Sequence, residues 1–353
     1  MTTTNRLASC YWPAPAPNAN TYSCALLTST PGYTPRDGCK VEFFDGKYWL
    51  LGGWWPTMAP DGPNGWSATN ITTNEVWSSV DLLTWTLELA HDDNPPTSGP
   101  GARWKPVHTM PTWVHDGLLW VAAGDDYDSG QDPPGTVRSD VWNSPDGLVW
   151  TRVAATSPWG YGEGLWNAVP GLYNGEMHLL GGQRAAFPGQ PVNDRPACRE
   201  HWRSTDGVNW ERLPDMPFAV SRVLRALPLD GKLFVVGGGT GEIGVGVTFS
   251  RTWGYDGTYW REMSTDSNGV WIGREWIATA VFDDKLWAAT GVHRETVENQ
   301  SGCFMSRDLG RSWEKVGSLW QASHADGLAV GPDGLVLCTG RLQYTNVFLV
   351  TPD

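Results

Sequence analysis

Hydrophobic positions in this chain occur in short runs that polar turn residues separate at regular intervals. Six runs lead into a pair of turn residues and are followed by a second hydrophobic run. Asp-Gly and Asn-Gly pairs favour the tight turn of a two-residue β-hairpin. We therefore predict six hairpins, with turns at Asp45-Gly46, Asp116-Gly117, Asn174-Gly175, Asp230-Gly231, Asp283-Asp284 and Asp333-Gly334.

A repeated phrase marks the second half of each unit. A third hydrophobic run ends in a turn that contains Asp, usually followed by Gly, and a fourth run begins at a Trp four or five residues beyond this Asp. The phrase occupies residues 144–150, 204–210 and 254–260, with a weaker copy at 79–85 and a longer one at 306–313. Such self-similarity at long period indicates a repeated supersecondary unit. Short, evenly spaced strands with periodic Gly and aromatic residues are typical of a β-propeller.

The units predict an all-β, six-bladed β-propeller with four antiparallel strands in each blade. The sixth unit ends before a fourth strand. We expect the N-terminal arm, residues 1–38, to supply that outer strand near residues 21–27 and to close the ring, because closure removes exposed strand edges. The propeller itself is predicted over residues 39–353, with blades near 39–90, 106–154, 164–213, 220–263, 273–316 and 323–350.

Two motifs carry a family resemblance that extends over roughly residues 39–350. The double glycine after the second strand, as at Gly52-Gly53, resembles kelch repeats. Residues 306–313 are similar to the Asp-box pattern S-x-D-x-G-x-[ST]-W of sialidase-type propellers. The resemblance to a kelch-like or Asp-box superfamily implies the fold. It does not select a function, because such propellers include hydrolases, oxidases, epimerases and binding modules.

The aspartates of the repeated phrase are predicted to be structural. In an up-and-down sheet, the turn between strands 3 and 4 emerges on the face opposite to the long, variable loops. Its Asp can accept hydrogen bonds from turn amides, its Gly can adopt a positive φ, and its Trp can pack between sheets. We therefore exclude Asp81, Asp146, Asp206, Asp256 and Asp308 from the candidate site.

The loop face is rich in aromatic residues, and Trp is frequent in the whole chain, with 23 in 353 residues. Flat aromatic side chains beside polar groups suit sugar rings. Alignment of the units on their first turns also brings imidazole, indole and guanidinium groups to the mouth of the central channel. The predicted ligand-binding residues are Trp54, Trp55, Trp66, Trp104, His108, Trp159, Trp166, Arg222, Arg274 and His324. Alternatively, the aromatic residues anchor their loops and the charged residues form salt bridges between neighbouring strands.

No complete catalytic set stands out, but an enzyme remains an alternative. If the protein is an enzyme, the candidates are Arg36, Asp37, Arg222, Arg274 and Glu275. Three arginines compare with the sialidase triad that binds a carboxylate, although the Arg-Ile-Pro sequence of sialidases is absent. A hydrolase of that type would need a nucleophile such as Tyr344, whereas an epimerase would need only acid and base groups. Glu275 with His108 or His324 could serve as those groups.

Charge and composition exclude several classes. The formal net charge is −13 and no Lys/Arg-rich run occurs, which disfavours nucleic acid and anionic membranes as partners. We find no signal peptide and no apolar stretch long enough to insert into a membrane, so a soluble protein is expected, with extracellular, virion or cell-surface exposure left open. No cofactor is predicted. Asp126, Asp128 and Asp132 are a weak calcium candidate, since the bidentate Glu of calcium loops is missing.

These observations favour a carbohydrate-binding recognition module that acts on a glycan or glycoconjugate in surface or host attachment, within a larger protein assembly. The first alternative is a glycan-processing enzyme, either a sialidase-like hydrolase or a sugar epimerase. The second is a protein-docking scaffold that uses the same loops and aromatic residues.

Overall fold

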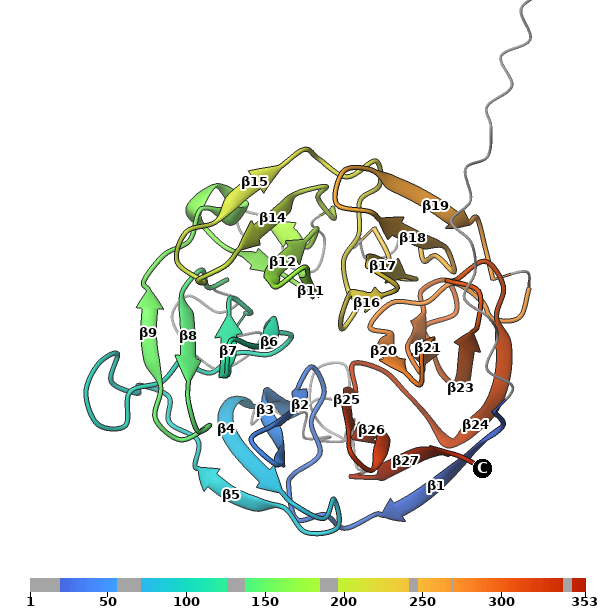
Figure 1. Cartoon of the computed structure of the whole chain (residues 1–353). Coiled ribbons are helices and arrows are strands. Elements are labelled where there is room, and N and C mark those ends of the chain that lie inside the picture. The colour runs from blue at the N-terminus through green and yellow to red at the C-terminus, as the bar shows by residue number, and fades with distance from the viewer. Residues whose placement is uncertain are drawn as a thin grey trace, which may run out of the picture.

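A computed structural model describes residues 20–55, 71–125, 137–184, 196–240, 247–267, 269–338 and 345–353. Its strands form six antiparallel blades that surround a central channel (Figure 1). The sequence prediction of an all-β six-bladed propeller is thereby confirmed. Each blade runs outward from an inner strand that lines the channel to an outer strand at the rim.

The first three blades follow one another along the chain. Blade I contains β2 (Lys40–Phe44), β3 (Lys47–Trp55), β4 (Ile71–Ser79) and β5 (Thr86–Leu89). Blade II contains β6 (Thr112–His115), β7 (Leu118–Ala122), β8 (Val141–Ser144) and β9 (Thr151–Ala154). Blade III contains β11 (Val169–Tyr173), β12 (Glu176–Leu180), β14 (His201–Ser204) and β15 (Glu211–Leu213).

The other three blades complete the ring. Blade IV contains β16 (Leu227–Leu229), β17 (Lys232–Val236), β18 (Thr252–Tyr255) and β19 (Trp260–Ser264). Blade V contains β20 (Ala278–Phe282), β21 (Lys285–Ala289), β23 (Glu298–Ser306) and β24 (Glu314–Ser323). Blade VI contains β25 (Gly327–Gly331), β26 (Gly334–Cys338), β27 (Val347–Pro352) and the N-terminal β1 (Tyr22–Thr28). Short strands β10 (Leu165–Trp166), β13 (Gln183–Arg184) and β22 (Val292–His293) and the 3-10 helix η2 (Trp159–Gly162) lie in the connections.

The hairpin turns explain why the inner two strands form where the sequence predicts them. Both turn residues have positive φ in the first five blades, for example 47° at Asp45 and 74° at Gly46. This geometry is the twisted two-residue turn that Asp-Gly and Asn-Gly pairs adopt. Blade VI differs, because Gly331 pairs with Gly334 and the turn residues are Pro332 and Asp333. The predicted turn at Asp333-Gly334 is therefore displaced by one residue.

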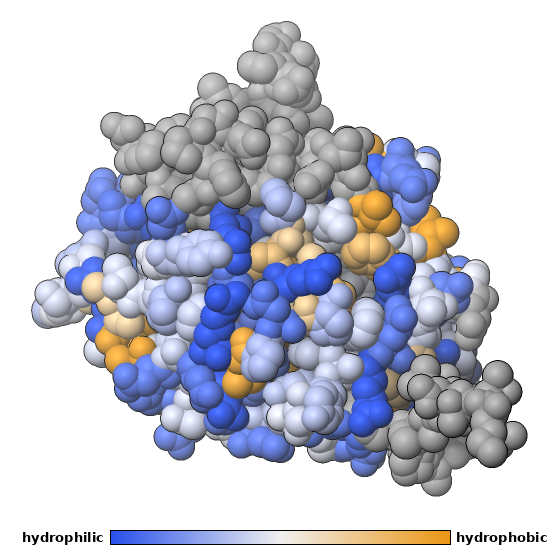
Figure 2. Space-filling model, turned by 90° about the horizontal axis from the view of Figure 1, so that it is seen from above, coloured by the Kyte–Doolittle hydropathy of each residue, from blue (hydrophilic) through white to orange (hydrophobic). Residues whose placement is uncertain are grey.

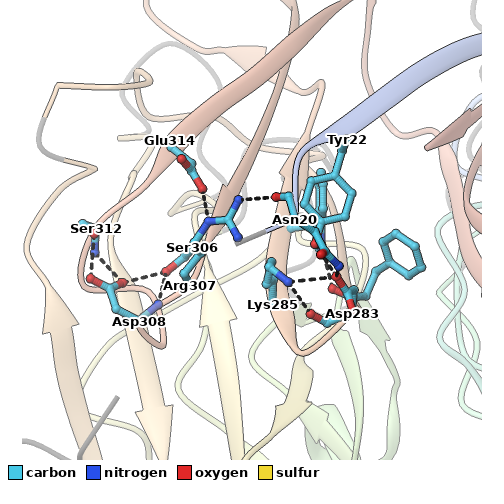
Figure 3. A network of polar contacts seen from close by, with 11 residues as sticks. Asn20, Tyr22, Asp283, Lys285, Ser306, Arg307, Asp308, Ser312 and Glu314 are labelled. Atoms are coloured by element: carbon cyan, nitrogen blue, oxygen red, sulfur yellow. Dashed lines mark hydrogen bonds and ion pairs between the residues drawn. The ribbon is translucent and has the colours of Figure 1, made fainter. Parts of the chain in front are cut away.

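The N-terminal strand closes the ring, as predicted. Strand β1 pairs antiparallel with β27, from Tyr22 opposite Pro352 to Thr28 opposite Val347, and Figure 1 shows the blue β1 beside the red β27. Residues just before and within β1 also contact blade V. Asn20 Nδ2 donates to Asp283 Oδ2 at 2.9 Å, and the Tyr22 hydroxyl donates to the same carboxylate (Figure 3). Closure therefore uses both the sheet edge of blade VI and polar contacts to its neighbour.

The hydrophobic core lies between the blades rather than in the channel. Trp side chains of the repeated phrase each meet an aromatic residue from a connection between blades. Trp104 and Trp150 contact edge to face at 4.4 Å, Trp159 and Trp210 at 4.7 Å, and Trp271 and Trp313 at 5.7 Å. The side of the ring in Figure 2 is mainly hydrophilic, with small, separate hydrophobic patches.

The Asp residue of each phrase holds its own turn. Asp146 Oδ1 accepts hydrogen bonds from the backbone N–H groups of Leu148 and Val149, both at 2.8 Å. Asp206 accepts from Val208 and Asn209 in the same way, at 2.9 and 2.8 Å. In the longer phrase, Asp308 binds the backbone and hydroxyl groups of Ser312 (Figure 3). These contacts agree with the structural role predicted for the phrase.

Candidate functional site

A ring of left-handed backbone surrounds the channel at the entrance of the six inner strands. One residue from each blade contributes to it, with φ between 49° and 63°: Gly38, Thr109, Asn167, Arg222, Trp276 and Ala325. Four backbone hydrogen bonds link neighbouring members, from Thr109 to Gly38, Arg222 to Asn167, Ala325 to Trp276 and Gly38 to Ala325. We call these six residues the channel ring. Left-handed backbone is costly for residues other than Gly, so the fold must hold these side chains in fixed directions.

The residue before five of the six ring members bridges the start of the loop that follows the second strand in its blade. Asp37 pairs with Trp54, His108 with Asp125, Trp166 with Gln183, Ser221 with Gly239, and Glu275 with Val292. This pairing joins two regions that the sequence predicted separately, the channel mouth and the long loops. Side chains from both regions therefore converge at one end of the channel.

Five side chains form what we call the mouth cluster: Arg222, Glu275, Trp276, Arg294 and His324. Arg222 Nη1 lies 3.0 Å from Glu275 Oε2, and Arg294 Nη2 lies 2.6 Å from Glu275 Oε1. The Arg222 and Glu275 side chains are almost fully buried, whereas Arg294 retains 12% of its side-chain exposure. One carboxylate is thus bound by two guanidinium groups, which fixes the orientation of all three.

Trp276 is the aromatic centre of the mouth cluster. The guanidinium carbon of Arg222 lies 4.6 Å from its ring centroid, and that of Arg294 lies 5.4 Å away. The His324 ring stacks on Trp276 at 5.2 Å with an interplanar angle of 21°. His324 also approaches Asn299 Oδ1 with Nδ1 at 2.5 Å and Asp37 Oδ2 with Nε2 at 3.9 Å. The arrangement presents cationic, amide and aromatic groups at fixed positions around the mouth.

A second imidazole lies beside the cluster. His108 Nδ1 is 2.6 Å from Asp125 Oδ1, and both side chains are buried. Burial alone disfavours the imidazolium, but the adjacent carboxylate outweighs it and raises the pKa of His108. Its ring centroid lies 6.1 Å from that of Trp166. A His–carboxylate pair of this kind can hold or transfer a proton if a substrate reaches it.

Arg36 and Arg274, two of the predicted arginines, do not join the mouth cluster. Each lies inside its own blade and donates to backbone carbonyl groups there. Arg274 binds Ile272 O at 3.2 Å and Thr290 O at 3.0 Å. Arg36 binds the equivalent carbonyls of Thr34 and Gly52, and also Glu75 at 2.6 Å. Burial lowers the pKa of Arg274 to about 10. The structure therefore does not assemble the three predicted arginines into one anion-binding group.

The predicted aromatic residues occupy different environments. Trp104, Trp159 and Trp166 are buried, with 2% or less of their surface exposed. Trp54 is 7% exposed, and Trp55 at the end of β3 is partly exposed. Trp66 lies outside the described residues. Of these positions, Trp55 offers the most accessible ring in the described structure.

Among the described residues, Tyr161 is the most exposed aromatic residue on the loop side, with 73% of its surface accessible. Its backbone φ of 63° is left-handed, and the Arg184 guanidinium lies 4.3 Å from its ring centroid. Arg184 is held in turn by the buried Glu200 at 2.7 Å. The loop that carries Tyr161 is thus fixed while its ring faces solvent.

The structure does not test the calcium candidate, because Asp126, Asp128 and Asp132 lie outside the described residues. Within the described ranges, no three or more His, Cys, Asp or Glu side chains come together in a group that could hold a metal ion. The same part of the chain contains no helix long and apolar enough to span a bilayer.

Sequence reasoning missed Trp276, Arg294, Asn299 and Asp125. Trp276 directly follows the predicted Glu275, so the alignment of the turns could have placed it in the channel ring. Asp125 forms a backbone bridge with His108 that is equivalent to the bridge between Asp37 and Trp54 in blade I. Arg294 directly follows β22, and Asn299 is the second residue of β23; no periodic pattern in the sequence specifies this part of blade V.

Comparisons with known proteins support the fold and no more. No family model matches the sequence. No curated protein matches it either. Among solved structures, the one titled "Structure of YjhT" is similar with a TM-score of 0.65 and 13% identity, and the match covers 93% of this chain and 100% of that chain. At this identity, the similarity shows a shared propeller fold.

Proposed function

We propose that this propeller is a carbohydrate-binding module whose ligand enters the channel mouth on the loop side. The observation that carries the proposal is the mouth cluster, in which Arg222, Arg294 and His324 surround the partly buried Trp276. Binding sites for small polar ligands combine an apolar surface with a few precisely placed polar groups. A sugar ring offers hydroxyl groups that pair with such fixed donors and acceptors.

The buried charges of the cluster support a binding role over a purely structural one. Buried ion pairs contribute little net stability, because desolvation offsets much of their attraction. The desolvation of two arginines and one glutamate is therefore not explained by a gain in the stability of the propeller. They do, however, hold guanidinium N–H groups in a preorganised direction, which reduces the entropy lost when a ligand binds.

A glycan array with the purified protein tests this proposal, and it should be read for both binding and product. We expect a defined set of glycans to bind, and both Trp276→Leu and Arg294→Met to weaken that binding at least tenfold. Arg212→Met is the matched control, because Arg212 lies on the outer strand β15 and pairs with Asp215 at 2.7 Å. Absence of any glycan signal, or unchanged binding in folded mouth variants, would contradict the proposal and favour a protein-docking scaffold.

A second candidate is a glycan-processing enzyme, which the His108–Asp125 pair favours. A buried imidazole with a raised pKa is suited to general acid catalysis. Mass spectrometry and NMR of the array glycans after incubation would reveal sugar release or inversion of a ring centre. If a product forms, His108→Gln should abolish it while leaving glycan binding detectable. Binding without product would leave the recognition module as the function.

A further inference from the structure

A second cavity lies in the channel on the hairpin side, away from the mouth cluster. It holds about 210 Å³ and is lined by the inner strands of all six blades. Its walls are mainly apolar, and they include Phe43, Trp113, Leu172, Leu227, Val281 and Val330. This volume is below the roughly 300–1,000 Å³ typical of sites for drug-sized ligands. The cavity suits a small, largely apolar molecule.

The channel ring separates this cavity from the mouth. The space next to the ring, bounded by Gly38, Thr109, Asn167 and Arg222 among others, holds about 10 Å³. A water molecule needs about 10–15 Å³, so protein atoms fill nearly all of this space. None of the residues that line the hairpin-side cavity belongs to the mouth cluster, so the two are distinct sites.

Charged groups lie at the inner end of the cavity and beside the channel ring. Arg225 and Glu42 form an ion pair, and the Thr112 hydroxyl donates to Glu42 Oε1 at 2.6 Å. Lys40, two residues before Glu42 on the same strand, is buried, and its Nζ donates to Leu224 O at 3.3 Å. Arg222, which borders the ring, pairs with Glu275 at the mouth. Glu42 and Arg225 line the cavity itself, whereas Lys40 lines the space next to the channel ring. Of the groups that act electrostatically on Lys40, Arg225 is a cation and Glu42 is a carboxylate.

An excess cation in a low-dielectric channel is costly. Burial, together with the positive charge of Arg225, lowers the pKa of Lys40 to about 8. An anion bound beside Arg225 would offset part of this cost, because the charges of Arg225 and Lys40 act on each other. Arg225 lines the cavity directly and keeps 26% of its side-chain exposure, so its guanidinium is available to an entering group.

We propose that the hairpin-side cavity binds a small apolar monocarboxylate. The carboxylate accepts hydrogen bonds from the Arg225 guanidinium, with Lys40 behind it, and the hydrocarbon part lies against the apolar walls. Arginine recognises a planar carboxylate through two parallel hydrogen bonds. A single carboxylate suffices, because Glu42 already pairs with one of the two cations.

Titration calorimetry of the full chain with hexanoate tests the proposal, with hexanamide as the uncharged analogue of nearly equal shape. We expect one hexanoate per chain at millimolar concentration or below, and binding of hexanamide at least tenfold weaker. Absence of binding at hexanoate concentrations up to about 10 mM would overturn the proposal. Equal affinity for acid and amide would overturn the assigned role of Arg225 and Lys40.

Variants place the binding in the cavity. Val330→Trp adds bulk at the rim of the cavity, where Val330 is 38% exposed, and should abolish hexanoate binding. Val80→Trp is the matched control, because Val80 is 70% exposed on the same face but does not line the cavity. Arg225→Gln should weaken hexanoate binding at least tenfold. If this variant does not fold, Arg225→Lys takes its place, because it keeps the positive charge and removes the guanidinium group. Loss of binding in Val80→Trp, or full binding in folded Val330→Trp, would contradict the assigned location.

Discussion

The glycine of the repeated phrase meets two constraints at a single residue. A Cβ atom at Gly147 would lie 2.5 Å from Cζ3 of Trp49, and one at Gly207 would lie 2.4 Å from Cζ3 of Trp120. Both tryptophans belong to the preceding blade. Both glycines also have positive φ, 75° and 70°. The phrase is therefore repeated because its glycine packs one blade against the next and its Asp holds the turn that makes this contact.

We predict that Gly207→Ala destabilises the protein more than Gly175→Ala. Gly175 has a φ of 74°, but a Cβ atom there would meet nothing within 4 Å, so its variant measures the backbone penalty of about 1–2 kcal/mol. Gly207→Ala adds overpacking against Trp120, which typically costs a further ~1–3 kcal/mol. Chemical denaturation of both variants and the native protein provides the comparison. Equal midpoints for the two variants would mean that Trp120 moves aside without cost.

Arg36 and Arg274 illustrate why residue type alone did not locate the site. Both arginines precede a ring-bridging residue, and both donate to carbonyls two residues before and sixteen residues after themselves. This shared pattern makes them internal braces of blades I and V. The sequence shows a guanidinium near the channel in all three cases, but only the backbone geometry distinguishes Arg222, which points to Glu275, from the two braces.

At the scale of elements, the closing strand depends on contacts that lie outside its own blade. Tyr22 packs edge to face on Trp287 at 4.9 Å, and its hydroxyl binds Asp283. This hydrogen bond is the largest factor that lowers the pKa of Asp283 to about 2. Lys285 and Asn20 bind the same carboxylate at 2.9 Å, and Arg307 donates to Asn20 O at 2.7 Å (Figure 3). The start of β1 is thus attached to blade V, while the whole strand pairs with β27 of blade VI.

Tyr22→Phe should weaken this attachment without removing the aromatic packing. We expect a loss of about 1 kcal/mol in stability, which is the usual net contribution of one hydrogen bond. We also expect the substitution to increase the rate of hydrogen exchange more in β1 and β27 than in the strands of the other blades. Tyr259→Phe is the matched control, since Tyr259 is 66% exposed. Hydrogen exchange followed by mass spectrometry resolves the strands. A uniform change over all six blades would show that Tyr22 does not act through ring closure.

The sequence predicted the elements that hydrophobic runs and turn chemistry specify. Five hairpins have the expected turn residues, and β1 occupies the segment expected for the missing outer strand. The sixth turn is displaced because Pro332, whose φ is fixed near −65°, occupies the first turn position. Strands β10, β13 and β22 were not predicted, since each has two residues and no alternation can be recognised in so short a segment.

At the scale of the whole molecule, the turn alignment predicted which residues approach the channel but not which of them meet. It placed Asp37, Arg222, Glu275 and His324 at the mouth, and the structure brings them close to one another. It could not predict Trp276 as their centre, because contacts between blades depend on the rotation of each blade about the axis. Arg294 comes from a loop whose conformation depends on tertiary contacts with Glu275.

A buried histidine pair outside the site gives the whole protein a pH-dependent stability. His178 on β12 and His201 on β14 lie with Nδ1 and Nε2 2.8 Å apart. Tyr255 lies against both rings, at 6.4 and 5.0 Å. Burial lowers the pKa of His178 to about 4 and that of His201 to about 3. Both rings are therefore neutral in the folded protein at pH 5, where the histidines of an unfolded chain, with a pKa near 6.5, are protonated.

Because the unfolded chain takes up these protons first, stability contributed by the pair is complete above about pH 6.5 and decreases as the pH falls towards 4. The decrease is at most about 1.4 kcal/mol per pH unit for each histidine. His108 has a raised pKa and contributes in the opposite direction. We therefore predict that the double variant His178→Gln/His201→Gln loses less stability between pH 7 and pH 5 than the native protein, with the His108 contribution common to both. Denaturation midpoints at the two pH values measure this difference. His91→Gln is the control for a partly exposed histidine. Parallel pH profiles for the native and double-variant proteins would show that the pair does not control acid stability.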